Sequence, residues 1–136
     1  MIGTEGFIIK HCISDDHGGS LTLIAAKSGP GVLYGAFALI RRISCGDFSH
    51  GTHIVENPSL ALRMVNQWDN MDGSIERGYA GLSIFYRDGR ILKNSRRIRD
   101  YARLLASIGL NGIVLNNVNV HSTETRLITK EQLPKV

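Results

Sequence analysis

The chain has 136 residues, 43% of them hydrophobic, which is enough for a folded domain with a core and excludes a largely disordered tail. Its formal net charge is +4, but lysines and arginines are scattered among acidic residues, which does not favour a nucleic-acid-binding stripe. The first residues do not show the basic start and apolar stretch that are typical of a signal peptide. No run approaches the roughly 20 apolar residues of a membrane span.

The first third of the chain predicts two strands and a helix. Residues 7–9 open a short apolar strand, and residues 21–26 form a second one rich in apolar and β-branched side chains. Ser28 then supplies a helix cap, Pro30 suits a first helical turn, and Gly46 is placed to end the helix. We expect the strands to be neighbours in one sheet.

A polar segment follows. Residues 47–58 contain Gly51 and Pro58 and are expected to bury little. Such a segment suits a boundary between two structural units, which we place near residue 57.

The second part of the chain has the pattern of a βαβ unit. Residues 60–68 read as a strand, Ser95 begins a helix that Gly109 ends, and residues 113–115 form a near-continuous apolar strand. The predicted helix carries one apolar face, made by Ile98, Tyr101, Ala102, Leu105 and Ile108. The two strands of such a unit lie parallel, so both end at the carboxyl edge of the sheet, where α/β folds build ligand sites.

The last eight residues predict the start of another helix, with Thr129 and Gln132 in capping-box positions. A chain that stops there leaves an open parallel sheet edge, which is uncommon in a complete protein. We therefore expect a piece of a larger α/β fold.

The only tryptophan, Trp68, lies among amides and acids at the predicted edge. An indole ring can stack on the apolar face of a sugar while amides and carboxylates bind its hydroxyl groups. Equally, the acids and amides can cap turns while Trp68 fills the core. Asp69, Asp72 and Glu76 can be read as an acid/base set, but turn caps or partners of Arg77 are the favoured interpretation.

A second group of amides, at 116–119, ends the other predicted strand. Amides there need partners, and the position favours a ligand for at least one of them. His17 and His121 have no visible partner and receive no role. Cys12 and Cys45 are expected to be buried free thiols, and nothing predicts a metal site.

Together these residues resemble a known family. The run at 62–81, LRMVNQWDNMDGSIERGYAG, closely resembles the start of the catalytic barrel in the xylan α-glucuronidases of glycoside hydrolase family 67. Residues 3–7 and 31–35 resemble the end of that family's N-terminal α/β domain, and residues 101–119 resemble its first barrel helix and second strand. Gln67 departs from the family, in which histidine is expected.

The resemblance implies an α/β fold in two parts. Residues 1–57 would be the C-terminal part of the N-terminal α/β domain, and residues 58–136 the first two β/α units of a truncated (β/α)8 TIM barrel. The implied reaction is inverting hydrolysis of the α-1,2 bond between glucuronic acid, or its 4-O-methyl ether, and xylose in xylooligosaccharides. It needs no metal or cofactor. The catalytic carboxylates belong to later barrel strands, so we expect no catalytic residue here and no activity from this chain alone.

By the same resemblance, Trp68 and Val118 line the uronic acid pocket near the 4-O-methyl group. Arg77 either holds the uronate carboxylate or forms a structural salt bridge. Further substrate contacts are expected from Asn66, Asp69, Asn70 and Asn117.

Two other classes of protein would also use features of this sequence. A stand-alone carbohydrate-binding or interaction module would use Trp68 as its platform and close its own core, whereas an enzyme fragment should expose apolar faces. Nucleic-acid binding through the arginine-rich helix is disfavoured by the interspersed acids. We expect glucuronoxylan-derived oligosaccharides as partners, no membrane, a cytoplasmic location, and a parent enzyme for which a homodimer is one option.

Overall fold

The computed structural model describes residues 1–13, 18–93, 96–115, 129–131 and 133–135. The chain divides into two compact units. Unit 1 comprises Met1–Arg63 with Leu104–Leu110, and unit 2 comprises Met64–Arg103 with Asn111–Val136.

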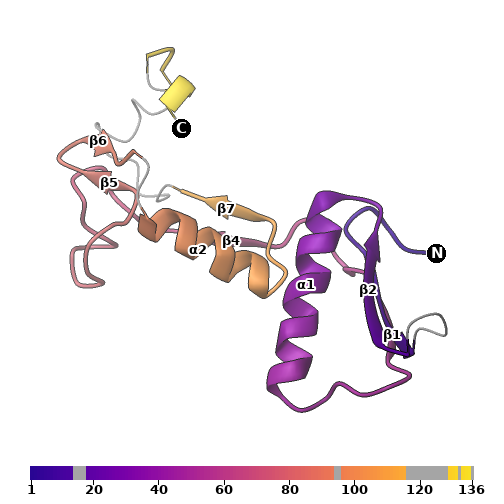
Figure 1. Cartoon of the computed structure of the whole chain (residues 1–136). Coiled ribbons are helices and arrows are strands. Elements are labelled where there is room, and N and C mark those ends of the chain that lie inside the picture. Colours follow the sequence, from indigo (N-terminus) through magenta and orange to yellow (C-terminus); the bar gives the residue numbers. More distant parts are fainter. Residues whose placement is uncertain (14–17, 94–95, 116–128, 132, 136) are drawn as a thin grey trace. The chain divides into compact units, whose positions relative to one another are not determined.

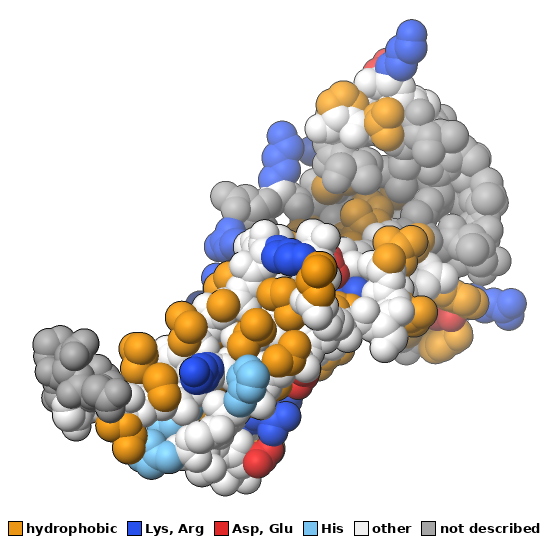
Figure 2. Space-filling view, turned by 90° about the vertical axis from the view of Figure 1, so that its right-hand side faces the viewer, with side chains coloured by type: hydrophobic (Ala, Val, Ile, Leu, Met, Phe, Trp, Pro, Cys, Tyr) orange, Lys and Arg blue, Asp and Glu red, His pale blue; other side chains and the backbone are white. Residues whose placement is uncertain are grey.

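Unit 1 is an antiparallel sheet covered on one face by a helix (Figure 1). Its strands are β1 (Phe7–Ile13), β2 (Ser20–Ala26) and β3 (His53–Glu56), in the order β2-β1-β3. The helix, α1 (Gly29–Ser44), follows β2 directly. The two predicted strands and the helix are therefore confirmed. The opposite face of the sheet is seen in Figure 2.

The start and end of α1 follow from its sequence. Ser28 is extended, with φ −145°, and its Oγ accepts a hydrogen bond from the Gly31 amide at 3.2 Å. Pro30 lies in the first turn, where its missing N–H costs nothing. Gly46, just past the end, has φ +72°, a left-handed conformation that favours glycine. The neighbouring thiol of Cys45 is exposed, so the prediction that it is buried is wrong, and Cys12 is half-buried.

The core of unit 1 lies between α1 and the sheet. Ile9, on the central strand, is 0% exposed and packs with Phe7, Tyr34 and Ala38. Gly35 allows the helix to approach closely, because a Cβ there would lie 2.7 Å from the Cγ2 of Ile24. The core therefore depends on small residues along α1.

β3 was not predicted, because it falls in the polar segment taken as a boundary. It is only four residues long and places one half-buried apolar residue, Ile54, on the α1 side, opposite Ile9. An alternation of buried and exposed residues over only four positions is too weak to predict a strand from sequence. The strand forms because β1 offers it a free edge to pair with. The assignment of residues 1–57 and 58–136 to two domains stays a prediction.

Unit 2 contains a two-stranded parallel sheet. β4 (Met64–Asn66) pairs with β7 (Gly112–Val114), Met64 opposite Gly112 and Asn66 opposite Val114. The predicted parallel pairing of the two strands is confirmed. The first strand is shorter than the predicted 60–68.

The helix α2 (Arg96–Ser107) joins these strands, and Gly109 follows it with φ +80°. Its predicted apolar face is confirmed in part. Ile98, Tyr101 and Leu105 are half-buried, whereas Ala102 and Ile108 are exposed. Ser95 lies outside the described residues.

A hairpin between β4 and α2 was also not predicted. β5 (Tyr86–Arg87) pairs with β6 (Arg90–Ile91) across Asp88 and Gly89, whose φ values are +50° and +72°. An Asp-Gly pair is a strong two-residue hairpin signal, so this feature was readable from the sequence. Tyr86 forms the core of unit 2 together with Met71 and Phe85.

The end of the chain corrects another expectation. Leu133–Lys135 is a short 3-10 helix, and the Leu133 amide donates to the Thr129 carbonyl at 2.9 Å. The described helical residues at this end are thus a 3-10 helix that begins after Thr129, and Gln132 of the proposed capping box lies outside the described residues. None of the described helices is long and apolar enough to cross a membrane.

Candidate functional site

The loop that follows β4 starts at the carboxyl end of the parallel pair. The Gln67 amide donates to the Val114 carbonyl at 2.8 Å, which extends the pairing one residue past β4. The Trp68 carbonyl then accepts from the Glu76 amide at 2.8 Å, and Asp69 forms an isolated bridge with Ile75. Residues 68–76 are therefore a loop closed by its own backbone, placed where the sequence predicted a ligand site.

Trp68 is partly open to solvent. Trp68 is 36% exposed, whereas the neighbouring Asp69 is 1% exposed. Trp68 is thus not part of the buried core of the described residues. The indole therefore keeps some surface that a ligand could contact.

Asp69 is the one charged residue that the described part of the chain buries. Its Oδ1 atom has no hydrogen-bond partner among the residues that the structure describes. Burying a carboxylate oxygen without a donor is costly, so such groups are normally paired. Asp69 is therefore an unusual buried group of this loop, and its carboxylate is not accessible to a ligand from solvent.

Asn70 and Asp72 are engaged within the loop. The Asn70 amide nitrogen donates to Ser74 Oγ at 2.9 Å and to the Glu76 carbonyl at 2.7 Å. Asp72 Oδ1 accepts from the backbone amide and the hydroxyl of Ser74, at 2.8 and 2.7 Å. Glu76 itself has φ +57°. These contacts agree with the interpretation of Asp72 as a turn cap.

The remaining predicted residues occupy different positions. Asn66 ends β4 and is exposed, while the Gln67 side-chain amide donates to the Tyr101 hydroxyl. Gln67 therefore anchors the loop to α2 in the place where the family resemblance led us to expect histidine. Arg77 is exposed and forms no ion pair with a described residue, so the expected structural salt bridge is not seen.

The second predicted cluster is not covered by the structure. Val118, Asn117 and the other amides at 116–119 lie outside the described residues, as do His17 and His121. Within the described ranges, no group of three or more His, Cys, Asp or Glu side chains could hold a metal ion.

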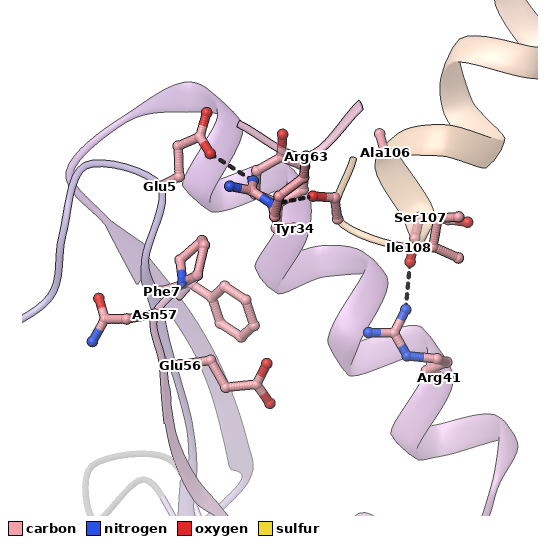
Figure 3. Close-up of a pocket in the computed structure, with 12 residues that line it drawn as sticks. Glu5, Phe7, Tyr34, Arg41, Glu56, Asn57, Arg63, Ala106, Ser107 and Ile108 are labelled. Carbon is pink, nitrogen blue, oxygen red and sulfur yellow. Dashed lines mark hydrogen bonds and ion pairs between the residues drawn. The ribbon is translucent and has the colours of Figure 1, made fainter. Parts of the chain in front are cut away.

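Unit 1 holds a separate cavity of about 200 Å³, and Arg63 is one of the residues that line it (Figure 3). The guanidinium donates to the Gly109 carbonyl, the Leu60 carbonyl and Glu5 Oε2, each at 2.6 Å. Its carbon Cζ lies 5.6 Å from the centre of the Tyr34 ring. All three guanidinium nitrogen atoms donate hydrogen bonds within the protein, so Arg63 has a structural role: it joins Glu5, Leu60 and Gly109, and we call this arrangement the Arg63 clasp. Sequence reasoning missed this role.

The comparisons with known proteins agree with the family resemblance. The described structure defines a mixed α/β chain with a parallel strand pair. The family described as glycosyl hydrolase family 67 middle domain matches residues 42–136. This chain belongs to glycosyl hydrolase family 67.

Curated relatives extend the similarity to nearly the whole chain. A probable alpha-glucuronidase A of Aspergillus oryzae is 43% identical over 132 residues, which are 97% of this chain and 15% of the relative. The proteins of Aspergillus terreus, also a probable alpha-glucuronidase A, and of Aspergillus tubingensis, an alpha-glucuronidase A, are 50% and 47% identical over 105 residues. Those residues are 77% of this chain and 12% of each relative. The chain thus spans less than a sixth of the length of these relatives.

Proposed function

We propose that this chain is a segment of an α-glucuronidase. The whole enzyme would hydrolyse, with inversion, the α-1,2 bond between glucuronic acid, or its 4-O-methyl ether, and xylose in xylooligosaccharides. Membership of family 67 and the names of the curated relatives support this activity. The substrates would be oligosaccharides derived from glucuronoxylan, and the reaction would use no cofactor.

Residues 58–136 would supply the first two β/α units of a (β/α)8 barrel. The parallel pairing of β4 with β7 and the helix α2 between them support this arrangement, because a barrel is built by repeating that unit. The described residues form an open two-stranded sheet, which further strands would have to extend.

The observation that carries the proposal is the partly exposed Trp68 on the loop after β4. Its indole would offer a stacking face for the uronic acid ring, whereas Asp69 is 1% exposed and would support the loop from within, out of reach of a sugar. Asn66 and Asn70 would flank the pocket, and the resemblance adds Val118 and Asn117. The role of this segment is to bind and orient the glucuronic acid.

The chemistry itself would come from two carboxyl groups on later barrel strands. One would protonate the departing xylose oxygen, while the other would activate a water molecule on the opposite face of the sugar. In the described loop, Asp72 is engaged as a turn cap, and Asp69 is buried. Neither is arranged to deliver a proton to a leaving group and activate water across the same bond.

The alternative, a stand-alone sugar-binding or interaction module, accords less well with the exposed apolar side chains. Leu62 is 75% exposed, Leu82 is 72% exposed and Ile108 is 63% exposed. A module that folds and functions alone would bury more of this surface. The predictions of a cytoplasmic location and of a homodimeric parent enzyme stay predictions.

A chimera tests the proposal directly. The matching segment of the Aspergillus tubingensis alpha-glucuronidase A would be replaced by this chain, and release of glucuronic acid from aldotriouronic acid would be measured. We expect activity from the chimera and a loss of at least about tenfold in kcat/KM with Trp68→Ala. The matched control is Tyr79→Ala, because Tyr79 is 76% exposed and lies outside the Trp68–Glu76 loop closure. A folded chimera that stays active with Trp68→Ala would exclude this site.

The chain alone provides a second test. Incubated with aldotriouronic acid, the 136-residue protein should release no glucuronic acid, because its catalytic partners would lie elsewhere. Clear turnover would contradict this expectation and would place the acid and base among Asp69, Asp72 and Glu76.

A further inference from the structure

The Arg63 clasp joins the two stretches of chain that lead into the parallel strands. Arg63 is the residue immediately before β4, and its Nη1 atom donates to the Leu60 carbonyl at 2.6 Å. Its Nε atom donates to the Gly109 carbonyl, also at 2.6 Å. Only two residues separate Gly109 from Gly112, the first residue of β7. One side chain therefore holds the chain together just before both strands begin.

The guanidinium itself is held in place. Its Nη2 atom donates to Glu5 Oε2 at 2.6 Å, and the side chains of Arg63 and Glu5 are only 16% and 27% exposed (Figure 3). The ring of Tyr34 lies 5.6 Å from Cζ, within the range of a cation–π contact. A guanidinium is planar and its donors point in fixed directions, so each of these contacts also orients the bonds to the two carbonyls.

The stretch before β7 has two further attachments within unit 1. Arg41 donates to the Ser107 carbonyl, and the Tyr34 hydroxyl donates to the Leu110 carbonyl at 3.4 Å. The last carbonyls of a helix have no partner inside it, and a cation there also meets the negative end of the helix dipole. Residues 107–110 are therefore fixed by side chains of α1 and by Arg63.

The strands that follow the clasp are too short to define their own register firmly. Each has three residues, with Met64 opposite Gly112, and a slip by one residue would turn every side chain of a strand to the other face. At the far end, the Gln67 amide continues the pairing by donating to the Val114 carbonyl at 2.8 Å. The next residue is Trp68, so the register decides where the indole lies.

We infer that Arg63 is a positioning residue for the proposed sugar site. By holding the chain before both strands, Arg63 sets the register of β4 against β7 and thereby the position of Trp68 at the other end of β4. This role in sugar binding rests on the proposed function, whereas the effect of Arg63 on the register does not. Arg63 itself would touch no sugar, because its three nitrogen atoms already donate to protein oxygen atoms.

Two substitutions separate positioning from mere stabilisation of unit 1. Arg63→Lys keeps a positive charge beside Glu5, but an ammonium group lacks the planar fork that bonds both carbonyls and Glu5 at once. Glu5→Gln is the matched control, because it removes the charge of the ion pair and keeps both an acceptor oxygen and the whole of Arg63. Each variant nearly preserves side-chain length, so both should fold, which circular dichroism can verify.

Amide hydrogen exchange of the 136-residue chain, followed by NMR, tests the register. In Arg63→Lys we expect the Gln67 amide to exchange at least about tenfold faster, with the His11 amide unchanged. The His11 amide donates to the Thr52 carbonyl at 2.9 Å, and His11 belongs to unit 1 as Arg63 does, so it reports a general loss of stability there. Glu5→Gln should not change the ratio of the two rates.

Arg41→Ala is a second variant that leaves Arg63 in place. It removes the bond to the Ser107 carbonyl at an exposed position, and the Gln67 amide should again exchange faster, by a smaller factor. The inference is wrong if the Gln67 and His11 amides accelerate equally, or if Gln67 exchange is unchanged in both arginine variants.

The chimera described above tests the consequence for the sugar. With Arg63→Lys, KM for aldotriouronic acid should rise at least about fivefold while kcat changes less than about twofold, because a displaced indole weakens binding of the substrate. Glu5→Gln should leave both constants nearly unchanged. An unchanged KM in Arg63→Lys would overturn the positioning role. A chimera without any substitution that shows no activity would instead contradict the proposed function, and the exchange rates would then decide whether Arg63 sets the register.

Discussion

The two units of this chain form their cores in different ways. In unit 1, two seven-residue strands pair along their full length, and α1 seals one face over Ile9. In unit 2, the parallel strands are three residues long, and the buried core is Met71, Phe85 and Tyr86, all contributed by the loop and hairpin after β4. Unit 1 is stabilised mainly by regular elements, whereas unit 2 depends on an irregular segment held by local hydrogen bonds.

This difference bears on the proposed sugar site, which lies in the irregular segment of unit 2. The loop at 68–76 is ordered by bonds among its own residues, such as those of Asn70 and Asp72 with Ser74. The loop therefore presents Trp68 and buries Asp69 through its own bonding. Under the proposed function, strands added to the parallel sheet would build a pocket around this loop.

The largest effect is expected from Ile9→Ala, which should lower the free energy of unfolding by about 4 kcal/mol. Ile9 is fully buried against α1, so the truncation leaves a cavity in the only regular core of the described residues. Urea unfolding followed by circular dichroism measures the change. Val55→Ala on the exposed face of the same sheet is the control and should cost far less. Equal costs would contradict a core located on the α1 side.

Arg63→Ala should cost about 3 kcal/mol, because it removes three hydrogen bonds from a largely buried guanidinium and leaves Glu5 without this ion-pair partner. The matched control is Arg42→Ala, since Arg42 pairs with Asp47 at a position where both side chains are solvent-accessible. That substitution should change stability by less than about 1 kcal/mol. Similar thermal unfolding midpoints for the two variants would contradict a stabilising role for the three hydrogen bonds of Arg63.

Gly31→Ala should destabilise unit 1 by about 2 kcal/mol. A Cβ at this position would lie 2.8 Å from both the Gly6 carbonyl oxygen and the Cβ of Ala26, so backbone must move. Gly29→Ala adds the same atom two residues earlier, where no described atom beyond its chain neighbours and the backbone of its own helix lies within 4 Å. Thermal unfolding should therefore separate the two variants, and a tolerated Gly31→Ala would show that the approach of α1 to the sheet is looser than described.

The smallest effect, about 1 kcal/mol, is expected from Asp72→Ala in unit 2, because the Ser74 amide and hydroxyl lose an acceptor. Trp68 is the only tryptophan, so its fluorescence reports on this loop specifically. We expect a shifted emission and a lower unfolding midpoint. Asp88→Asn, in the hairpin turn, is a conservative control that keeps a residue tolerant of positive φ. If neither the emission nor the unfolding midpoint changes, the hydrogen bonds of Asp72 are not what orders the loop.

Sequence alone predicted the features that regular local patterns encode. The caps of α1 at Ser28 and Gly46 are set by side-chain chemistry and backbone freedom at single positions. The parallel pairing of β4 with β7 follows from the helix between them. The family resemblance, carried by the run at 62–81, was likewise readable without coordinates, and the match to family 67 confirms it.

Only the tertiary structure decided the rest. β3 forms because β1 has a free edge, Arg63 meets Glu5 across 58 positions of sequence, and Asp69 is buried while its neighbour Trp68 is not. A periodic pattern reports which face of an element is apolar, but burial and ion pairing depend on which distant segment the chain brings alongside.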